Sequence, residues 1–422
     1  MMSRWQWVLT LFARKLWIRV SVMALIGVAT AVAGIVFAPY VPDTWTIKIG
    51  AQAIDGILNV LASSMLSVTV FSMTTMVSAY GAATSNVTPR ATRLLMEDNT
   101  SQNVLGTFIG SFLFSLVGII ALSTGLYGSE GRAILLVVTI GLIALIAITI
   151  LRWIDYLARF GRLGETVARV EDATWDALRT RREHPHLGGR PMDDPPPPEA
   201  RAVFGNTIGY VQYIDMAALQ ELAADGGLTI FVTAPPGVFA DPARPVARVA
   251  GEMDDKGALA VAQAFTIGPE RTFDQDPRFG LCVLSEIASR ALSPAVNDPG
   301  TAIDVIGRAV RLLVRWNGCD GPEDDADVAC EDVRVPAIAV DDMFDDVFAP
   351  IARDGAGTLE VQLRLQKALA SLAVADAEVF GAAARRHSAT ALRRAEAALT
   401  LPEERDAVAA LAAGIGAVRT AG

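Results

Sequence analysis

Cysteine and histidine are scarce in this sequence, which has three of each. No two cysteines form a C-x-x-C pair, and no histidine stands near a cysteine at the spacing of a zinc site. Cys282, Cys319 and Cys330 are therefore expected to be free thiols in a reducing compartment. The sequence predicts neither a disulfide framework nor a metal site.

Motifs that bind phosphate or carry out catalysis are also missing. The sequence has no G-x-x-x-x-G-K-[ST] loop, no dinucleotide-binding glycine fingerprint, no G-x-S-x-G elbow and no H-E-x-x-H pair. Nothing in the pattern supports an enzyme or a cofactor. The formal net charge of −10 leaves no basic surface that would release counterions from nucleic acid, so nucleic acid is excluded as a partner.

Apolar residues, by contrast, are abundant and unevenly distributed. They make up 52% of the chain and concentrate in residues 1–153. A bilayer core requires about 20 consecutive apolar residues in a helix. Four stretches meet this demand, at about Arg19–Ala38, Ile54–Ala83, Val104–Tyr127 and Ala133–Leu151. The sequence therefore predicts a multi-pass protein of a bacterial inner membrane, in contact with the lipid bilayer.

Basic residues near the ends of these spans predict their orientation, because cytoplasmic segments are enriched in Lys and Arg. The opposite side would carry only Lys48 and Arg132. Both termini are therefore expected to be cytoplasmic. The basic residues on the cytoplasmic side would be Arg4, Arg14, Lys15, Arg19, Arg90, Arg93, Arg152, Arg159 and Arg162.

The second span carries a polar stripe. At about 100° per residue, seven polar side chains fall on one side of this helix. Two interpretations stay open: the stripe packs helices together, or it lines a water-filled path without fixed charge. Hydroxyls can also bond to a carbonyl of their own helix, so the stripe does not require water. Its members are Asn59, Ser63, Ser64, Ser67, Thr74, Thr75 and Ser78.

The rest of the chain divides by composition. No proline occurs between Ala133 and about Arg182, so the fourth span is expected to continue as a helical stalk over 154–183. A proline-rich linker follows at 184–200. Short strand and turn patterns then alternate with helical patterns over 201–422. The predicted fold class is a membrane α-helical N-terminal region of four transmembrane helices plus a cytoplasmic α+β domain that ends in helices.

Four runs of residues resemble a known family. They are Gly209–Asp215, Pro236–Phe239, Ile267–Pro277 and Arg290–Ala302, the last reading RALSPAVNDPGTA. Together they resemble the bacterial predicted membrane proteins grouped as domain of unknown function 2254. The resemblance covers most of the chain. The sequence differs from the family pattern at Ala240, where a valine is expected. It implies fold and location rather than an activity.

The last of these runs is a candidate ligand or switch loop. A loop that ends at a helix N-terminus presents free backbone N–H groups, which can hold an anion. Arginines would add positive charge, whereas carboxylate and amide oxygens could hold a hard cation instead. A hydrogen-bonded structural turn is the competing interpretation. The candidate residues are Arg271, Asp274, Asp276, Arg290, Ser293, Asn297, Asp298 and Thr301.

These observations lead to one hypothesis and one alternative. The hypothesis is a homo-oligomeric, channel-like or solute-path protein with a cytoplasmic regulatory domain that binds a small anionic or cationic ligand. The alternative is a membrane-anchored sensor or scaffold without conduction. The permeant species, the ligand and the subunit number are left open.

Overall fold

The computed structural model describes residues 7, 9, 12–13, 15–37, 51–96, 98–159, 162–318 and 328–416. The chain forms two compact units. Residues 8–85 and 92–166 make a helical bundle, and residues 1–7, 86–91 and 167–422 make an α/β unit. Arg4, Arg14, Lys48 and Cys319, on which the sequence-based predictions drew, lie outside the described residues.

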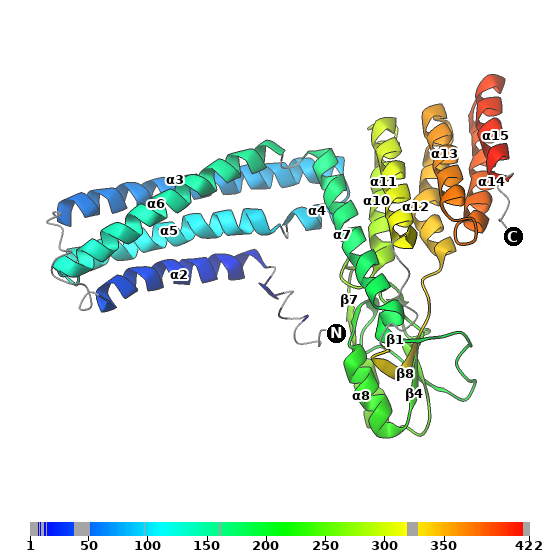
Figure 1. The fold of residues 1–422 in the computed structure, drawn as a ribbon, viewed down its shortest axis with the longest axis horizontal. Coiled ribbons are helices and arrows are strands. Elements are labelled where there is room, and N and C mark those ends of the chain that lie inside the picture. The colour runs from blue at the N-terminus through cyan, green and yellow to red at the C-terminus, as the bar shows by residue number, and fades with distance from the viewer. Residues whose placement is uncertain are drawn as a thin grey trace. The chain divides into compact units, whose positions relative to one another are not determined.

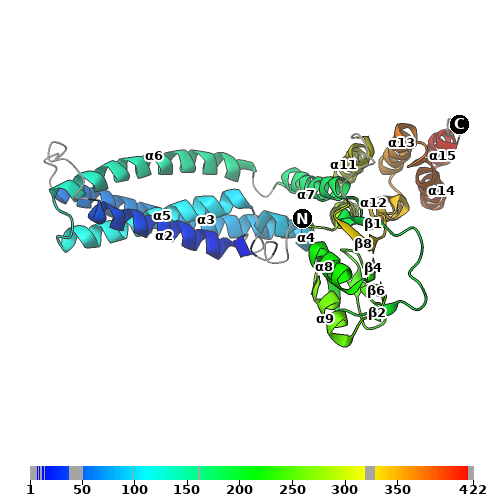
Figure 2. The ribbon, with the colours of Figure 1, turned by 60° about the horizontal axis from the view of Figure 1, so that its bottom comes forward.

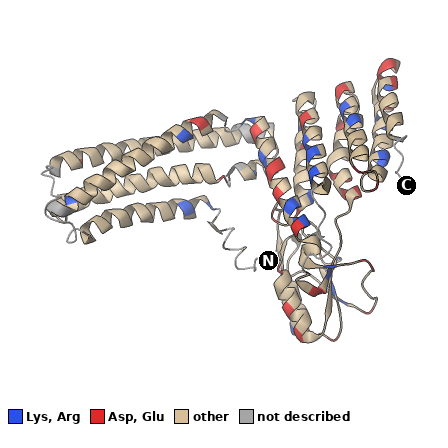
Figure 3. Ribbon diagram, viewed as in Figure 1, with Lys and Arg blue, Asp and Glu red and all other residues tan. Residues whose placement is uncertain are grey.

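The bundle consists of long apolar helices that run side by side (Figure 1). Four of them are long and apolar enough to cross a membrane. Their outward faces carry large exposed apolar side chains such as Leu25, Val70 and Ile140, as a lipid-facing surface requires. Charged residues are nearly absent from these helices (Figure 3). The helices are α2 (Leu16–Val36), α3 (Ala51–Asn86), α5 (Asn99–Ser123) and α6 (Ser129–Arg159).

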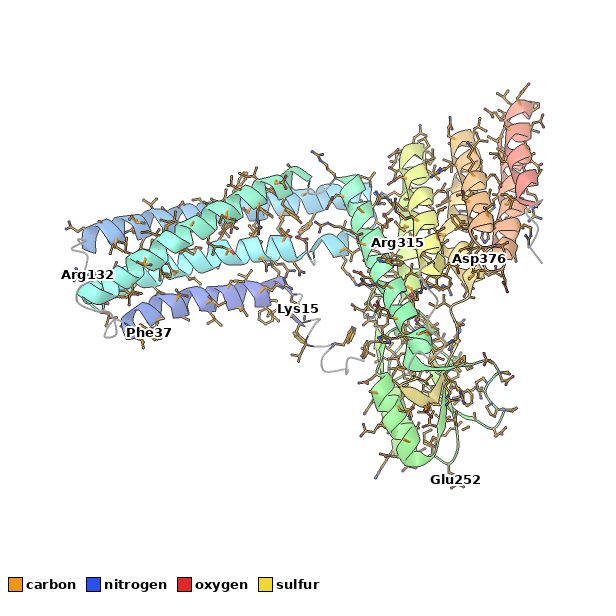
Figure 4. All side chains as sticks on the ribbon, in the orientation of Figure 1. Lys15, Phe37, Arg132, Glu252, Arg315 and Asp376 are labelled. Atoms are coloured by element: carbon orange, nitrogen blue, oxygen red, sulfur yellow. The ribbon has the colours of Figure 1, made fainter. Side chains whose placement is uncertain are left out.

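Small residues bring α2 and α5 into close contact. A Cβ atom at Gly110 would lie 2.7 Å from the Met23 carbonyl oxygen, and one at Gly106 would lie 3.0 Å from Met23 Cγ. Only glycine allows the two backbones to approach this far, as in other membrane helix pairs. Figure 4 marks the ends of the bundle: Phe37 and Arg132 lie at one end and Lys15 at the other.

The predicted stalk, 154–183, falls on two helices of the structure, with residues 160–161 between them outside the described residues. The fourth membrane helix ends at Arg159, and a separate helix, α7, spans Leu163–Glu183. From Val167 onward α7 belongs to the α/β unit, where Val167, Val170 and Leu178 are buried.

The larger sheet of the α/β unit has five strands in the order β1-β8-β4-β6-β2. β8 is parallel to both β1 and β4, and β6 is antiparallel to β4 and β2. Figure 2 shows these strands side by side with α8 and α9. The elements are β1 (Gly189–Pro191), β2 (Arg201–Val203), β4 (Thr229–Val232), β6 (Ala247–Ala250), β8 (Cys330–Val335), α8 (Met216–Gly226) and α9 (Asp255–Gln263).

The smaller sheet has three strands in the order β5-β3-β7: β3 (Gly209–Ile214), β5 (Phe239–Ala240) and β7 (Phe265–Gly268). Its side chains Val211, Ile214 and Phe265 share one core with the larger sheet. Within the expected linker, 184–200, the structure has η3 (Pro185–Gly188) and β1, and β1 pairs with β8. Backbone pairing with a distant strand is not visible in a proline-rich composition.

Helices make up the rest of the α/β unit (Figures 1 and 2). Phe344, Phe348 and Phe380 are fully enclosed at their centre, with the rings of Phe344 and Phe348 5.2 Å apart. The predicted fold class, four apolar N-terminal helices followed by a mixed α and β region, is confirmed. The helices are α10 (Pro277–Ala291), α11 (Pro299–Gly318), α12 (Val340–Asp354), α13 (Leu359–Ala375), α14 (Gly381–Ala398) and α15 (Pro402–Gly416).

Candidate functional site

An arginine-lined pocket lies where the loops after two parallel strands meet. β4 and β8 are parallel neighbours, with Ile230 opposite Val333. The loops after their carboxyl ends therefore emerge at one edge of the sheet, where α/β folds commonly bind ligands. The β4–β5 loop supplies Pro235–Val238, β5 supplies Phe239, and the β8–α12 loop supplies Pro336–Ala339. The cavity has a volume of about 440 Å³.

Four arginines and two aspartates line this cavity: Arg181, Arg244, Arg271, Arg278, Asp276 and Asp342. Three of the arginines already have carboxylate partners. Arg278 bonds to Asp342 and, at 2.7 Å, to Asp346. Arg244 lies 4.0 Å from Asp241. Arg271 pairs with Asp276, which leaves Arg181 as the fourth arginine of the cavity.

Asp276 is buried, and both of its carboxylate oxygens accept hydrogen bonds. Its two carboxylate oxygens accept from Arg271 Nε at 2.7 Å and Nη2 at 3.0 Å, and one also accepts from the Phe279 N–H at 3.2 Å. The pKa of Arg271 is raised: its burial acts to lower the pKa, but the bonds to Asp276 outweigh that effect. Asp276 also caps α10 and packs against Gly237, where a Cβ atom would collide with the carboxylate.

Arg181 is the exception. Its side chain projects from the last turn of α7, and the residue is only 9% exposed. Its Nε is enclosed and has no hydrogen-bond partner among the described residues. Burial lowers its pKa to about 10, with Asp276 acting in the opposite direction, so it stays charged at neutral pH. A buried charge without a bonded partner costs several kcal/mol, which a bound anion would offset.

A protein-family profile described as "Predicted membrane protein (DUF2254)" matches residues 13–371. The chain belongs to this family. The resemblance seen in the sequence is therefore confirmed. Two relatives are Uncharacterized protein Rv1290c of Mycobacterium tuberculosis and Uncharacterized protein Mb1321c of Mycobacterium bovis. Each is 29% identical over 268 residues, covering 60% of this chain and 50% of the relative.

The chain thus spans about half the length of the curated relatives it matches. No solved structure matches this DUF2254 protein. Family membership supports a multi-pass membrane protein and assigns no activity to the pocket.

Only part of the predicted ligand loop reaches the pocket of this DUF2254 protein. Arg271 and Asp276 line it, at the start of α10. Arg290 lies in the last turn of the same helix, about 20 Å away at 1.5 Å per residue. Asp274 does not line the cavity. The sequence-based set therefore falls into two groups at opposite ends of α10.

The second group forms a hydrogen-bonded turn between α10 and α11. Ser293 Oγ donates to the Arg290 carbonyl at 2.7 Å, and the Asn297 N–H donates to the Ser293 carbonyl at 2.8 Å. Asn297 adopts a left-handed backbone with φ of 50°. Asp298 caps α11 by accepting from the Thr301 N–H at 3.1 Å and from its hydroxyl. A ligand role for these residues stays a prediction.

The polar stripe on α3 points away from the other helices of the bundle. Asn59, Ser63, Ser67, Thr74 and Ser78 are exposed, and Ser64 and Thr75 are half-buried. The hydroxyls of Ser63, Ser67, Thr74 and Thr75 donate to carbonyls one turn earlier, at 2.9–3.0 Å. Met65 and Met76, in contrast, lie in the core of the bundle.

One α3 hydroxyl that does join helices is that of Ser72, which lies off the stripe. Ser72 is fully buried and accepts from Trp153 Nε1 of α6 at 2.9 Å. Within one bundle, then, the stripe does not pack α3 against its neighbours. Most of its side chains are exposed at the surface of the bundle.

The sequence-based reasoning missed Arg181, Arg244 and Arg278. A signal for Arg181 exists: Val167, Val170, Thr174 and Leu178 form the buried stripe of α7, and position 181 is the next member. A charge on the apolar face of an amphipathic helix marks a site that needs an explanation. Arg278 had no such signal, since its partners Asp342 and Asp346 lie more than sixty residues away in sequence.

Proposed function

We propose that this protein is a membrane-anchored receptor for a small anionic ligand, which binds in the arginine-lined pocket of the α/β unit. The observation that carries the proposal is Arg181, a buried guanidinium whose Nε has no partner among the described residues. Arg271 is held rigidly by Asp276 beside it. A prearranged site of this kind favours a phosphate or carboxylate group.

The test is the melting of the full chain in nanodiscs of neutral lipid, with and without inorganic phosphate. A ligand that binds only the folded state stabilises it by about 2.7 kcal/mol at roughly 100 times its Kd. The wild type should melt at a higher temperature with phosphate, and Arg181→Met should not respond. Without ligand, Arg181→Met should melt at or above the wild-type temperature, because it removes an unpaired buried charge.

Arg179→Met is the matched control. Arg179 lies on the same helix and is 54% exposed, with Asp176 and Glu183 as partners. This variant should keep the full phosphate response. Equal responses from Arg181→Met and the wild type would overturn the proposal.

A second candidate is a homo-oligomeric solute path lined by α3, and the outward orientation of the polar stripe supports it. A path along these hydroxyls could be closed only by another copy of the chain. Ser67→Cys on the stripe and Met65→Cys in the bundle core provide the comparison. Reaction of Ser67→Cys with a water-soluble thiol reagent, together with ion flux in liposomes, would support a path. Disulfide cross-linking between copies without flux would support a packed oligomer. If there is neither reaction with flux nor cross-linking, the stripe faces lipid.

We also propose that both termini are cytoplasmic. The Lys and Arg distribution supports this topology, and contacts inside the α/β unit agree with it. Trp7, which precedes α2, stacks on Tyr213 of β3 with ring centroids 4.9 Å apart. Arg90, at the start of α4 (Pro89–Met96) between α3 and α5, forms an ion pair with Glu286. Reporter fusions after Leu126 and at the C-terminus should give opposite signals; equal signals would contradict the topology.

A further inference from the structure

A second cavity adjoins the first at Arg181. It has a volume of about 370 Å³ and is lined chiefly by Trp316, His186, Pro185, Arg182 and Asn317. Arg181, Pro336, Ala337 and Ile338 line both cavities. The guanidinium with the unpartnered Nε therefore stands at the boundary between two spaces of different chemistry.

The second cavity offers flat surfaces rather than charge pairs. Trp316 is half-buried near the end of α11, and its carbonyl accepts from Arg182 Nη1 at 3.0 Å. His186 is half-buried, and its Nδ1 lies 2.8 Å from the Val335 carbonyl oxygen. Indole, imidazole and proline faces are the surfaces on which proteins stack planar rings.

The backbone that presents His186 is held in a rare conformation. His186 and Leu187 both adopt left-handed angles, with φ of 54° and 58°. The pairing of β1 with β8 and the His186–Val335 contact hold this turn in place. Such conformations in residues other than glycine concentrate at ligand-binding sites, where the surrounding structure maintains them.

The first cavity ends at a helix N-terminus. Ala339 is the N-cap of α12 and makes no side-chain cap bond. First-turn N–H groups of a helix favour anions. This helix start lines the same cavity as Arg181 and Arg271.

We infer that the ligand is a small molecule with a phosphate group and a flat ring, of the nucleoside monophosphate class. The phosphate would bind Arg181 from the arginine-lined cavity, and the ring would lie against Trp316 and His186 in the adjoining cavity. This inference rests on the proposed anion site and adds the ring that distinguishes one phosphate-bearing molecule from another.

The test compares inorganic phosphate, ribose 5-phosphate, adenosine and adenosine 5′-monophosphate as ligands of the full chain in phosphatidylcholine nanodiscs. Stacking on an aromatic side chain should make adenosine 5′-monophosphate bind about tenfold or more tightly than ribose 5-phosphate. Adenosine, which lacks the phosphate, should bind more weakly than both. Because these arms use the wild type, they do not depend on whether any variant folds.

Variants then assign the two halves of the site. Trp316→Leu should bring adenosine 5′-monophosphate down to the affinity of ribose 5-phosphate while phosphate binding persists. Arg181→Met should lose all three phosphate-bearing ligands. Trp175→Leu is the control, because Trp175 is a half-buried tryptophan of α7 that lines neither cavity.

Three outcomes would overturn the inference, and they differ from one another. Equal binding of phosphate, ribose 5-phosphate and adenosine 5′-monophosphate, all dependent on Arg181, would remove the ring but keep the anion site. An Arg181-dependent response to phosphatidic acid in the nanodisc, with none to the soluble nucleotide, would assign the phosphate to a lipid headgroup. No response to any probe would remove the proposed anion site itself.

Discussion

The two units of this protein satisfy their polar groups in opposite ways. In the membrane bundle the hydroxyls of α3 donate to carbonyls of their own helix, as Ser67 does to Ser63. In the α/β unit, arginines and carboxylates from distant segments pair with one another, as Arg308 and Arg311 do with Glu171. Where no water is available, a polar group must bond within its own helix or, as Ser72 does with Trp153, to a neighbouring helix. A folded soluble unit can use partners from anywhere in the chain.

Arg181 is an exception to this pairing within the α/β unit. Arg181 lies on the same buried face of α7 as Glu171's neighbours Val170 and Thr174, yet its Nε lacks a partner among the described residues. The ion pairs are structural where both charges are present. The ligand site that we propose lies at Arg181, for which the carboxylate partner is missing among the described residues.

The largest expected effect comes from breaking the Glu171 ion pairs. Glu171 is 7% exposed and accepts bonds from Arg308 and Arg311 at 2.6 and 2.9 Å. Glu171→Ala removes the hydrogen bonds that both arginines make to one buried carboxylate. Arg308 keeps Asp304 at 2.7 Å, and the Arg311 side chain is 55% exposed. The free energy of unfolding of the α/β unit should therefore fall by about 1.5–3 kcal/mol. Denaturant unfolding of the full chain, followed by near-ultraviolet circular dichroism, measures this loss.

Asp176→Ala is the control for that change. Asp176 lies on the same helix, but its side chain is 67% exposed and pairs with Arg179 at 3.1 Å. Loss of an exposed pair should cost about 0–1 kcal/mol. Similar losses from both variants would mean that burial does not set the strength of these pairs.

In the bundle, the largest effect should come from overpacking the contact between α2 and α5. Gly110→Ile places a branched side chain against the Met23 carbonyl oxygen, because a Cβ atom on residue 110 would lie only 2.7 Å from that oxygen. We expect a destabilisation of about 1–3 kcal/mol, since the two backbones must separate. Gly141→Ile on α6 is the matched control, because a Cβ atom there meets nothing within 4 Å. Unfolding in mixed detergent micelles compares the two, and equal losses would contradict the close contact.

A smaller effect is expected at the turn between α10 and α11. Asp298→Ala removes the cap that receives the Thr301 N–H at 3.1 Å and should cost about 0.5–2 kcal/mol. If the turn is only structural, phosphate should stabilise this variant as much as it stabilises the wild type. A lost phosphate response with unchanged melting would instead restore the switch role predicted from the sequence.

The smallest effect is the pH dependence contributed by His387. Burial lowers the pKa of His387 below 6.5, with Arg386 acting in the same direction and Asp345 in the opposite direction. Below pH 6.5 the unfolded chain binds more protons at this group than the folded chain does. The contribution to stability is therefore present above pH 6.5 and is lost as the pH falls towards the folded pKa.

Melting curves between neutral and mildly acidic pH test this contribution. His387→Gln should flatten the decline in melting temperature on acidification relative to the wild type. His184→Gln, at an exposed histidine, should leave the decline unchanged. An identical pH profile for His387→Gln and the wild type would exclude this histidine as a contributor.

Local features of this protein could be predicted from its amino-acid sequence. Runs of about 20 apolar residues sufficed for the four membrane helices, because span length is fixed by bilayer thickness. Gly106 and Gly110 stand four residues apart, a spacing typical of close helix packing in membranes, and α5 contacts α2 there. The alternation of short strands and helices expected over 201–422 is also present, for example in β3, α8 and β4.

Only the tertiary structure decided which distant groups meet. It joined the β4–β5 and β8–α12 loops around Arg181, Arg271 and Arg278, and it separated Arg271 from Arg290 by the length of α10. It also turned the α3 stripe away from the other helices of the bundle and placed β1 inside a segment that reads as a linker. Hydrophobic periodicity and composition indicate only how residues about one helical turn apart in the sequence are arranged. A pocket depends on contacts between residues far apart in sequence, which no local pattern encodes.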